Sequence, residues 1–352
     1  MLPYLVVFAI FAVAAFSAGS RPHGEYRQSL LISSFVLVIF IGLRLRVGGD
    51  WQNYLSLLEE VRYVDLWSAL SGMRGSDPAY VFINWLAAQA GAGIWVVNLI
   101  CATIFVWGLM RLCREQSNPP LAILVAIPYL VTVVAMGYTR QSAALGLIMY
   151  AIAQIRRRAN IKIVVSLVLA ASFHKSAVTV IPFFGIAAAS GAALNLILFA
   201  LVSYLGFALL LAGSVNQLIE NYVQSGYSSS GALVRVLMNV VPAVLYLGFS
   251  RRFGFENKQK LFWIGLSVAS LAALATLAIY PSSTAVDRLA LFFIPLQVVV
   301  LSRIPSIFSS EGRQNMILVT LVVLYSLAVD LVWLNFGAFS SAWIPYRNYL
   351  WS

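Results

Sequence analysis

The chain has little charge. Asp, Glu, Lys and Arg make up 10% of its 352 residues, whereas soluble globular domains carry about 25% charged residues. Hydrophobic residues make up 61% and occur in repeated runs. Each run is close to the ~20 residues that a helix needs to cross a ~30 Å hydrocarbon core. The scarcity of charge argues against a soluble domain and predicts an all-α, polytopic membrane protein.

Cysteine and histidine are also scarce, with two residues of each. Cys101 and Cys113 fall in one predicted helix, about 18 Å apart at helical rise, which is too far for a disulfide. The sequence contains no Walker loop, no Rossmann glycine fingerprint, no HExxH and no Cys/His zinc spacing. We therefore expect neither a metal nor a nucleotide cofactor.

Acidic residues are few, 12 against 23 basic ones, so the net charge is +11. Such a charge could indicate nucleic-acid binding. The basic residues, however, lie in short loops between apolar runs, where membrane topology places them. We expect the lipid bilayer as a partner and no nucleic acid.

The apolar runs predict about 12 transmembrane helices in a single domain, residues 1–352. The first run lacks the basic start of a signal peptide, so we interpret it as a retained helix. Most Lys and Arg lie inside if both termini are periplasmic, and the larger outer loops are then 44–93 and 214–232. The predicted spans are 2–19, 30–46, 94–112, 121–136, 139–155, 161–173, 176–190, 194–213, 233–250, 261–279, 287–303 and 315–335.

Two segments need a closer interpretation. Residues 161–190 could form one long helix or two short ones. We favour two, because one helix would turn the basic segment 251–260 to the outside. The loop 44–93 contains "NYLSLLEEV", which predicts an amphipathic helix lying on the membrane surface. Within the same loop, Asp77 and Pro78 have the residue types of an N-cap and a first helical position.

Basic residues begin several of the predicted helices at the outer face. Arg140, Arg235 and Arg288 each lie near a helix N-terminus, where free N–H groups and the helix dipole favour an anion. An Arg beside such an end predicts a phosphate or pyrophosphate site. The alternative is that each Arg extends toward lipid headgroups.

His174 is the one histidine near the predicted outer face. Imidazole can accept a proton near neutral pH, and the neighbouring Lys175 would favour its neutral form. The alternative is a structural histidine in a tight turn between helices. Aromatic residues of the loop 44–93, among them Tyr54 and Tyr80, could stack on sugars or line the membrane interface.

Five motifs in order resemble the EpsG family of bacterial membrane proteins, which are grouped with Wzy-type polysaccharide polymerases. The most specific part is the Arg-Gln pair that opens one helix, followed by Phe-His and then a Pro. The motifs are "RLRVGGDWQNY" (44–54), "DPAYVFINWL" (77–86), "GYTRQSAALGL" (137–147), "ASFHKSAVTVIPFF" (171–184) and "DRLALFF" (287–293).

The resemblance implies an inverting glycosyltransferase that joins polyprenyl-pyrophosphate-linked oligosaccharide repeats at the periplasmic face of the bacterial inner membrane. A chain-length regulator and export proteins could cooperate with it. The resemblance and the residues together suggest His174, Arg140, Arg288 and Asp50 as catalytic residues, with Asp50 or Asp77 as the second choice of base. The substrate-binding set is Arg44, Tyr54, Asp77, Tyr80, Gln141, Lys175, Arg235 and Asp287.

Two other functions stay open. A polysaccharide ligase or acyltransferase would also need arginines for pyrophosphate and one base. A transporter or flippase of lipid-linked sugars would also have buried arginines. It should show internal repeats with broken helices, and the sequence shows none.

Overall fold

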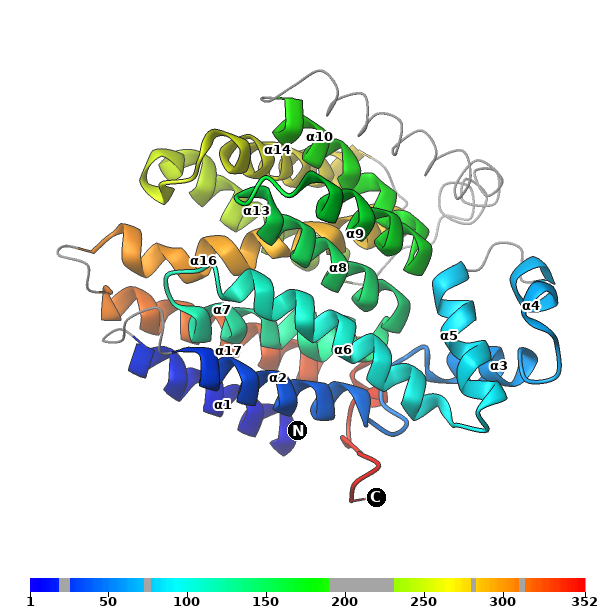
Figure 1. Ribbon diagram of the computed structural model, residues 1–352. Helices are drawn as coiled ribbons and strands as arrows, with labels where there is room; N and C mark the ends of the chain where they lie inside the picture. The colour runs from blue at the N-terminus through cyan, green and yellow to red at the C-terminus, as the bar shows by residue number, and fades with distance from the viewer. Residues whose placement is uncertain (19–25, 73–76, 190–230, 280–282, 310–313, 352) are drawn as a thin grey trace.

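The computed structural model describes residues 1–18, 26–72, 77–189, 231–279, 283–309 and 314–351. In these ranges the protein is built of helices, which confirms the all-α prediction (Figure 1). The α-helices are α1 (Leu2–Ser17), α2 (Tyr26–Gly42), α3 (Trp51–Glu60), α4 (Leu66–Gly72), α5 (Pro78–Gln89), α6 (Ile94–Cys113), α7 (Pro119–Ala126), α8 (Thr139–Ile155), α9 (Asn160–Phe173), α10 (Ile181–Ala189), α13 (Ala232–Phe249), α14 (Asn257–Ile279), α15 (Ser283–Ala290), α16 (Pro295–Ile307) and α17 (Met316–Phe336).

Four helical segments in the described part of the chain are long and apolar enough to cross a membrane. They are α6, α14, α17 and the segment Ala232–Phe253 that contains α13. A fifth results if Val286–Phe293 and Pro295–Ile307, which meet at 41°, form one broken span. The helices therefore support a membrane protein, while the total of 12 spans and the side of the termini stay predictions. The predicted span 194–213 and nearly all of the loop 214–232 lie outside the described residues.

A continuous buried helix occupies the centre of the bundle. Every residue from Pro119 to Ala135 is buried, and α1, α6, α16 and α17 pack around this segment. From Ile127 onward the helix widens to π-helical hydrogen bonding. Pro128, which has no N–H to donate, lies at this transition. The predicted span 121–136 is thus a real helix with a change of pitch.

Glycines allow α6 and α8 to approach closely. A Cβ added to Gly146 would lie 2.5 Å from Cα of Phe105, and one on Gly108 would collide with the backbone at Gly146. Small residues at such a crossing are typical of helix pairs in membranes, because packing rather than water exclusion drives their association. This contact holds the middle of α8 against α6.

The segment 161–190 is broken, as the two-helix interpretation predicts. Helix α9 ends at Phe173, His174 is extended with φ −157° and ψ 113°, and the 3₁₀ helix η4 (Lys175–Val180) follows. Helix α10 then continues from Ile181. The break leaves the side chain of His174 and the N–H of Lys175 free to form contacts outside their own helices, at one end of the bundle.

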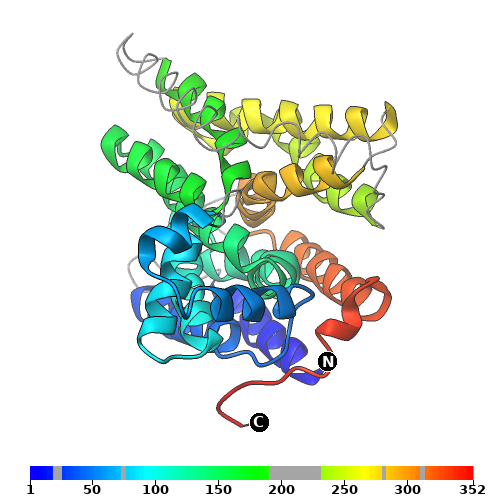
Figure 2. The same ribbon diagram turned by 90° about the vertical axis from the view of Figure 1, so that its right-hand side faces the viewer.

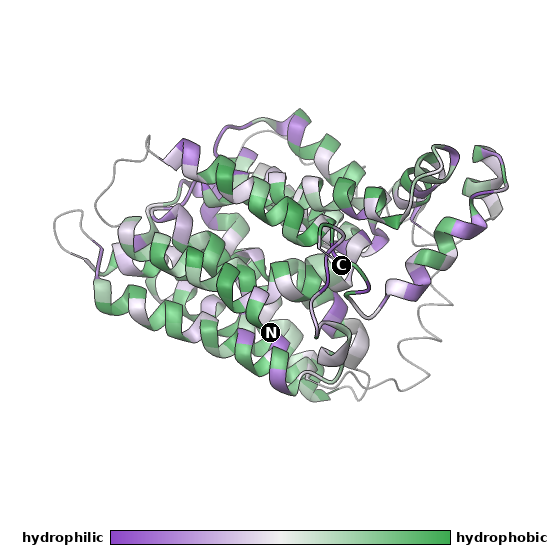
Figure 3. Cartoon of the chain, turned by 90° about the horizontal axis from the view of Figure 1, so that it is seen from below, coloured by the Kyte–Doolittle hydropathy of each residue, from purple (hydrophilic) through white to green (hydrophobic). Residues whose placement is uncertain are grey.

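The loop 44–93 is an arm of three helices, α3 to α5 (Figure 2). One face of α3 buries Trp51, Tyr54 and Leu58, which confirms the amphipathic pattern. Helix α3 packs on α5, and α5 packs on α6 and α9. Hydrophobic residues run along the bodies of the bundle helices, and hydrophilic residues gather at helix ends and in the arm (Figure 3).

The C-terminal tail closes the same end of the bundle. The indole N–H of Trp343 donates to the carbonyl of Thr132 at 2.6 Å, and its own carbonyl accepts from the Tyr4 hydroxyl at 2.9 Å. Arg44 and Asn348 form an isolated antiparallel bridge. Residues from both ends of the chain therefore support the segment that leads into the arm.

Candidate active site

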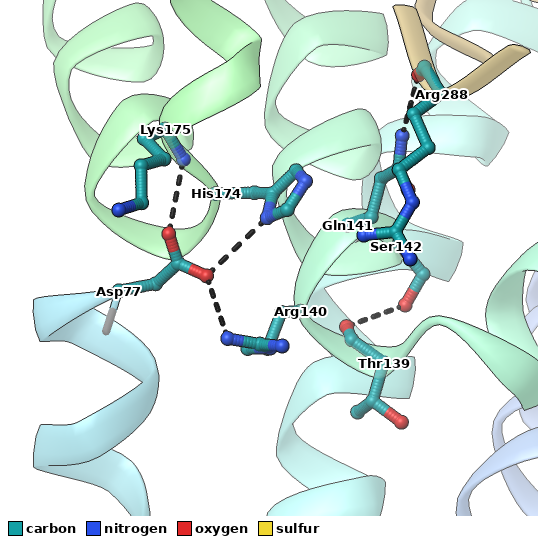
Figure 4. A network of polar contacts seen from close by, with 8 residues as sticks. All are labelled: Asp77, Thr139, Arg140, Gln141, Ser142, His174, Lys175 and Arg288. Carbon is teal, nitrogen blue, oxygen red and sulfur yellow. Dashed lines mark hydrogen bonds and ion pairs between the residues drawn. The ribbon is translucent and has the colours of Figure 1, made fainter. Parts of the chain in front are cut away.

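Asp77 is the centre of a polar cluster between the arm and the bundle. It occupies the N-cap position of α5, as predicted, but its side chain does not cap that helix. Its carboxylate, 2% exposed, instead accepts from Arg140 Nη1 at 3.1 Å through Oδ2 and from the backbone N–H of Lys175 at 3.0 Å through Oδ1. His174 Nδ1 lies 3.3 Å from Oδ2 (Figure 4). One carboxylate thus joins α5, α8 and the break after α9.

The contact with Asp77 selects a tautomer of His174. An ionised carboxylate can only accept hydrogen bonds, so Nδ1 must carry the hydrogen that points to it. In a neutral imidazole the other ring nitrogen, Nε2, then holds the lone pair. The side chain is 15% exposed, and its ring lies nearly parallel to that of Phe292, at 6.1 Å between centroids. His174 is therefore oriented on one side and has an acceptor nitrogen on the other.

Asp77 is stabilised in its ionised form. Burial acts to raise the pKa of its carboxyl, but three effects outweigh it: the hydrogen bond of His174, the charge that this imidazole carries when it is protonated, and the charge of Arg140. The backbone N–H of Lys175 adds to the lowering. The net effect holds the pKa of Asp77 below its usual value, so the carboxylate keeps its role as acceptor at neutral pH.

Two tyrosines of the arm lie beside Arg140. Its guanidinium carbon is 6.0 Å from the centroid of the Tyr80 ring, and the rings of Tyr80 and Tyr54 are 5.5 Å apart. Burial raises the pKa of Tyr54 to about 12, so it stays a neutral phenol. The hydroxyl of Tyr80 is buried and has no hydrogen-bond partner within the described ranges. The aromatic residues and the cation form one wall of the cluster.

Arg44 lies inside the protein, beneath the start of α8, and is 0% exposed. Its Nη1 donates to the carbonyl of Ile41 at 2.8 Å. Its Nη2 donates to Asn98 Oδ1 at 3.1 Å and to Thr139 Oγ1 at 2.7 Å. Arg44, predicted to contact substrate, thus ties α2 and α6 to the residue before Arg140 and acts on the site through that residue.

A second ion pair lies on the other side of α8. Arg235 of α13 forms a bidentate pair with Asp287 of α15, with contacts of 2.5 and 2.7 Å. Gln141 Nε2 donates to the carbonyl of Arg288 at 3.1 Å, which joins α8 to α15. The bond of Gln141 to the Arg288 carbonyl holds α15 next to the start of α8, and Arg235 is tied to α15 through Asp287.

Tyr138, the residue before α8, shows how near these groups are to one another. Burial raises the pKa of its phenol, and the charges of Arg235, Asp287, Asp50 and Arg288 all act on it. Asp50 also acts on Tyr54. The predicted site residues thus gather around the first turn of α8, although they come from segments far apart in the chain.

The EpsG family model matches residues 29–348. The chain belongs to the EpsG family. The match extends on both sides of the motifs between Arg44 and Phe293 and confirms the resemblance drawn from them. Searches of curated proteins and of solved structures find no match. Membership makes this chain an exopolysaccharide-related membrane protein, of a family associated with polysaccharide biosynthesis.

Sequence reasoning missed some residues of this EpsG family member. Asn98 and Thr139 hold Arg44, but a polar residue near a helix end carries no distinctive signal. Asp330 is fully buried in α17, and both carboxyl oxygens lack a hydrogen-bond partner among the described residues. The sequence does carry a signal for Asp330, because an acidic residue within an apolar span suggests a functional site by default.

Proposed function

We propose that this EpsG family member is a polysaccharide polymerase. It would be an inverting glycosyltransferase that joins polyprenyl-pyrophosphate-linked oligosaccharide repeats at the periplasmic face of the inner membrane. The observation that carries the proposal is the contact of Asp77 with His174 and Arg140. It supports the proposal because His174, our candidate base, and Arg140 share one carboxylate at the first turn of α8.

His174 is the general base in this proposal. The acceptor sugar hydroxyl attacks the anomeric carbon of the donor, and its proton passes to Nε2 of His174. The bond between the anomeric carbon and the pyrophosphate oxygen breaks, and the pyrophosphate leaves with the electron pair. Attack opposite the leaving group inverts the anomeric centre. Asp77 holds the imidazole in the tautomer that the step needs, as an orienting carboxylate does for other catalytic histidines.

The arginines stabilise the leaving group. Negative charge grows on the bridging oxygen as the glycosidic bond breaks, so a cation placed there binds the transition state more tightly than the ground state. Arg140 and Arg288 are our choices for this role, and Arg235 is available close by. The pairing of Arg235 with Asp287 suggests that Arg235 mainly positions α13 against α15.

The lipid part of the donor needs an apolar surface next to these cations. A cavity of about 430 Å³ lies between α13 and α17, lined by Arg235 at one end and by Met238, Val332 and Trp333 among others. A second cavity of about 710 Å³ shares Tyr325 with it and continues along the same two helices. We place the polyprenyl tail along this path, with its pyrophosphate beyond the Arg235 end of the cavity, toward Arg140 and Arg288.

Gene deletion followed by analysis of lipid-linked material tests the proposal. A polymerase mutant should accumulate single repeats on the lipid carrier and make no polymer. If full-length polymer still forms on the lipid carrier and only its attachment to the next acceptor is lost, the protein is a ligase. If repeats accumulate only on the cytoplasmic side of the membrane, it is a flippase. Either result would refute the polymerase assignment.

A further inference from the structure

A pocket lies between the first turns of α2 and the last turns of α6, far from the candidate active site. It measures about 310 Å³, and its lining includes Arg27, Arg111 and Arg114. Along α2, about 20 Å of helix separates Arg27 from the end that leads to Arg44. The pocket therefore belongs to the opposite end of the bundle, where α2 begins and α6 ends; these two helix ends lie on the left in Figure 1.

In the part of the chain that the structure describes, the three arginines have no anionic partner. Within the described ranges none of them makes a hydrogen bond or an ion pair through its side chain. The nearby acid Glu115 is already taken by Arg156 and Arg157, at 3.7 and 3.0 Å. Like charges that share a site repel one another. Three guanidinium groups around one pocket therefore favour a ligand with negative charge.

Apart from Ser34, the rest of the pocket is apolar. Leu31, which is 62% exposed, and Met110 line it with Trp107. The indole of Trp107 is held in place by stacking on Tyr150, at 4.1 Å between ring centroids. A free phosphate ion would gain nothing from these walls. A ligand with an anionic head and a hydrocarbon chain would satisfy both halves of the pocket.

We propose that this pocket binds one anionic phospholipid. Its phosphate lies among the three guanidinium groups, whose planar forks suit phosphate oxygens. One acyl chain runs along Leu31 and Trp107 toward the lipid-facing surface of α2 and α6. The site is independent of the glycosyltransferase assignment, because it shares no residue with the candidate active site.

Lipid binding to the purified full-length protein tests this proposal. Native mass spectrometry in detergent would count bound phosphatidylglycerol and phosphatidylcholine over a range of lipid concentrations. We expect one phosphatidylglycerol to bind more tightly than any phosphatidylcholine. Basic residues near a membrane contribute about fivefold each to binding of an anionic lipid. The triple variant Arg27→Gln/Arg111→Gln/Arg114→Gln should therefore weaken this binding by at least about tenfold.

A matched control separates a site from general surface charge. Arg158→Gln/Arg251→Gln/Lys258→Gln removes the same charge from residues that do not line the pocket and should leave the binding unchanged. An equal loss in both triple variants would overturn the proposal, as would equal binding of the two lipids. Competition by millimolar inorganic phosphate without phosphatidylglycerol preference would show a simple anion site and also refute it.

A second variant keeps the test valid if the triple variant fails to fold. Ser34 lines the apolar side of the pocket, and Ser34→Phe fills it without changing any charge. Weaker phosphatidylglycerol binding by this variant supports a lipid that enters the pocket. Unchanged binding would mean that the lipid does not occupy this cavity, and the proposal would fail.

Discussion

Replacing Asp77 by Asn changes the hydrogen bonding of His174 while keeping the shape of the side chain. When the NH₂ group of the amide takes the place of Oδ2, its oxygen still accepts from the backbone N–H of Lys175, whereas the bond from Arg140 is lost because Arg140 and His174 share Oδ2. The NH₂ group, when turned to His174, donates to Nδ1 and forces the hydrogen onto Nε2. The imidazole then offers a donor where the acceptor hydroxyl needs a base, so the variant should fold and fail in chemistry.

The size of the effect follows from the role of His174. General-base catalysis contributes typically about 10²–10⁴-fold, and the corresponding Asp-to-Asn change in a serine-protease triad costs about 10⁴-fold in turnover. We therefore expect a loss of about 10²–10⁴ in turnover for Asp77→Asn. Asp77→Ala should in addition destabilise the fold, because it leaves His174 and the Lys175 N–H without their acceptor. The ion pair adds less, since the Arg140 side chain is 36% exposed and partly screened.

The assay is the initial rate of chain growth from purified lipid-linked repeats, with protein level and melting temperature measured in parallel. His174→Ala, Asp77→Asn and the double variant form a cycle. When two residues act as one unit, the effects of their substitutions on turnover do not add. The double variant should therefore be no slower than the slower single variant. Wild-type turnover by Asp77→Asn, or fully multiplicative losses in the double variant, would refute the tautomer argument. Substantial polymer from His174→Gln would remove His174 as the base.

Four further predictions concern charge, packing and topology. Arg140→Lys should lose nearly as much polymerisation rate as Arg140→Ala, because a point charge cannot form the bidentate contact that pyrophosphate oxygens favour; equal rates for Lys and wild type would contradict this. Gly146→Val should lower stability by about 1–3 kcal/mol or prevent insertion, because the added methyl groups meet the backbone of α6; thermal unfolding in detergent measures it. The pKa of Asp77 lies below the ordinary 3.8 in the folded protein, so its contribution to stability is complete above about pH 4 and is lost as the pH falls further. The wild-type melting temperature should accordingly drop more steeply than that of Asp77→Asn as the pH falls from about 4 to about 2. A membrane-impermeant thiol reagent on whole cells should label Cys introduced at Ser71 and not at Asn257, and the reverse pattern would place the candidate site in the cytoplasm.

Much of the fold could be predicted from local patterns. Apolar runs and basic loops indicate membrane helices whatever their partners are, so α6, α14 and α17 were found within a few residues of their bounds. The break at His174 was also predicted, because one long helix would turn the basic segment 251–260 to the outside. The change to π-helical pitch after Ala126 was not predicted, because it depends on how the buried helix fits its neighbours.

The site was predicted less completely, because its contacts join segments that are far apart. The helix-capping pattern correctly predicts that Asp77 precedes α5. It does not predict the partners of the carboxylate, which are 63 to 98 positions away in the sequence. Arg44 belongs to a family motif and so suggested substrate binding, although burial gives it a supporting position. Residue type indicated which groups are polar and unusual in a membrane, whereas their partners depend on tertiary packing.

The position of Asp77 links the arm to the proposed chemistry. Arg140 and His174 belong to the bundle, and the carboxylate that orients them belongs to the arm. Asp77 therefore favours the required tautomer of His174 only while α5 is docked on α9. The same contacts stabilise the docking of α5, because burying the Asp77 carboxylate without its hydrogen-bond donors would cost free energy. Substitutions in the interface of α5 with α9 should thus affect turnover even where they touch neither sugar nor pyrophosphate.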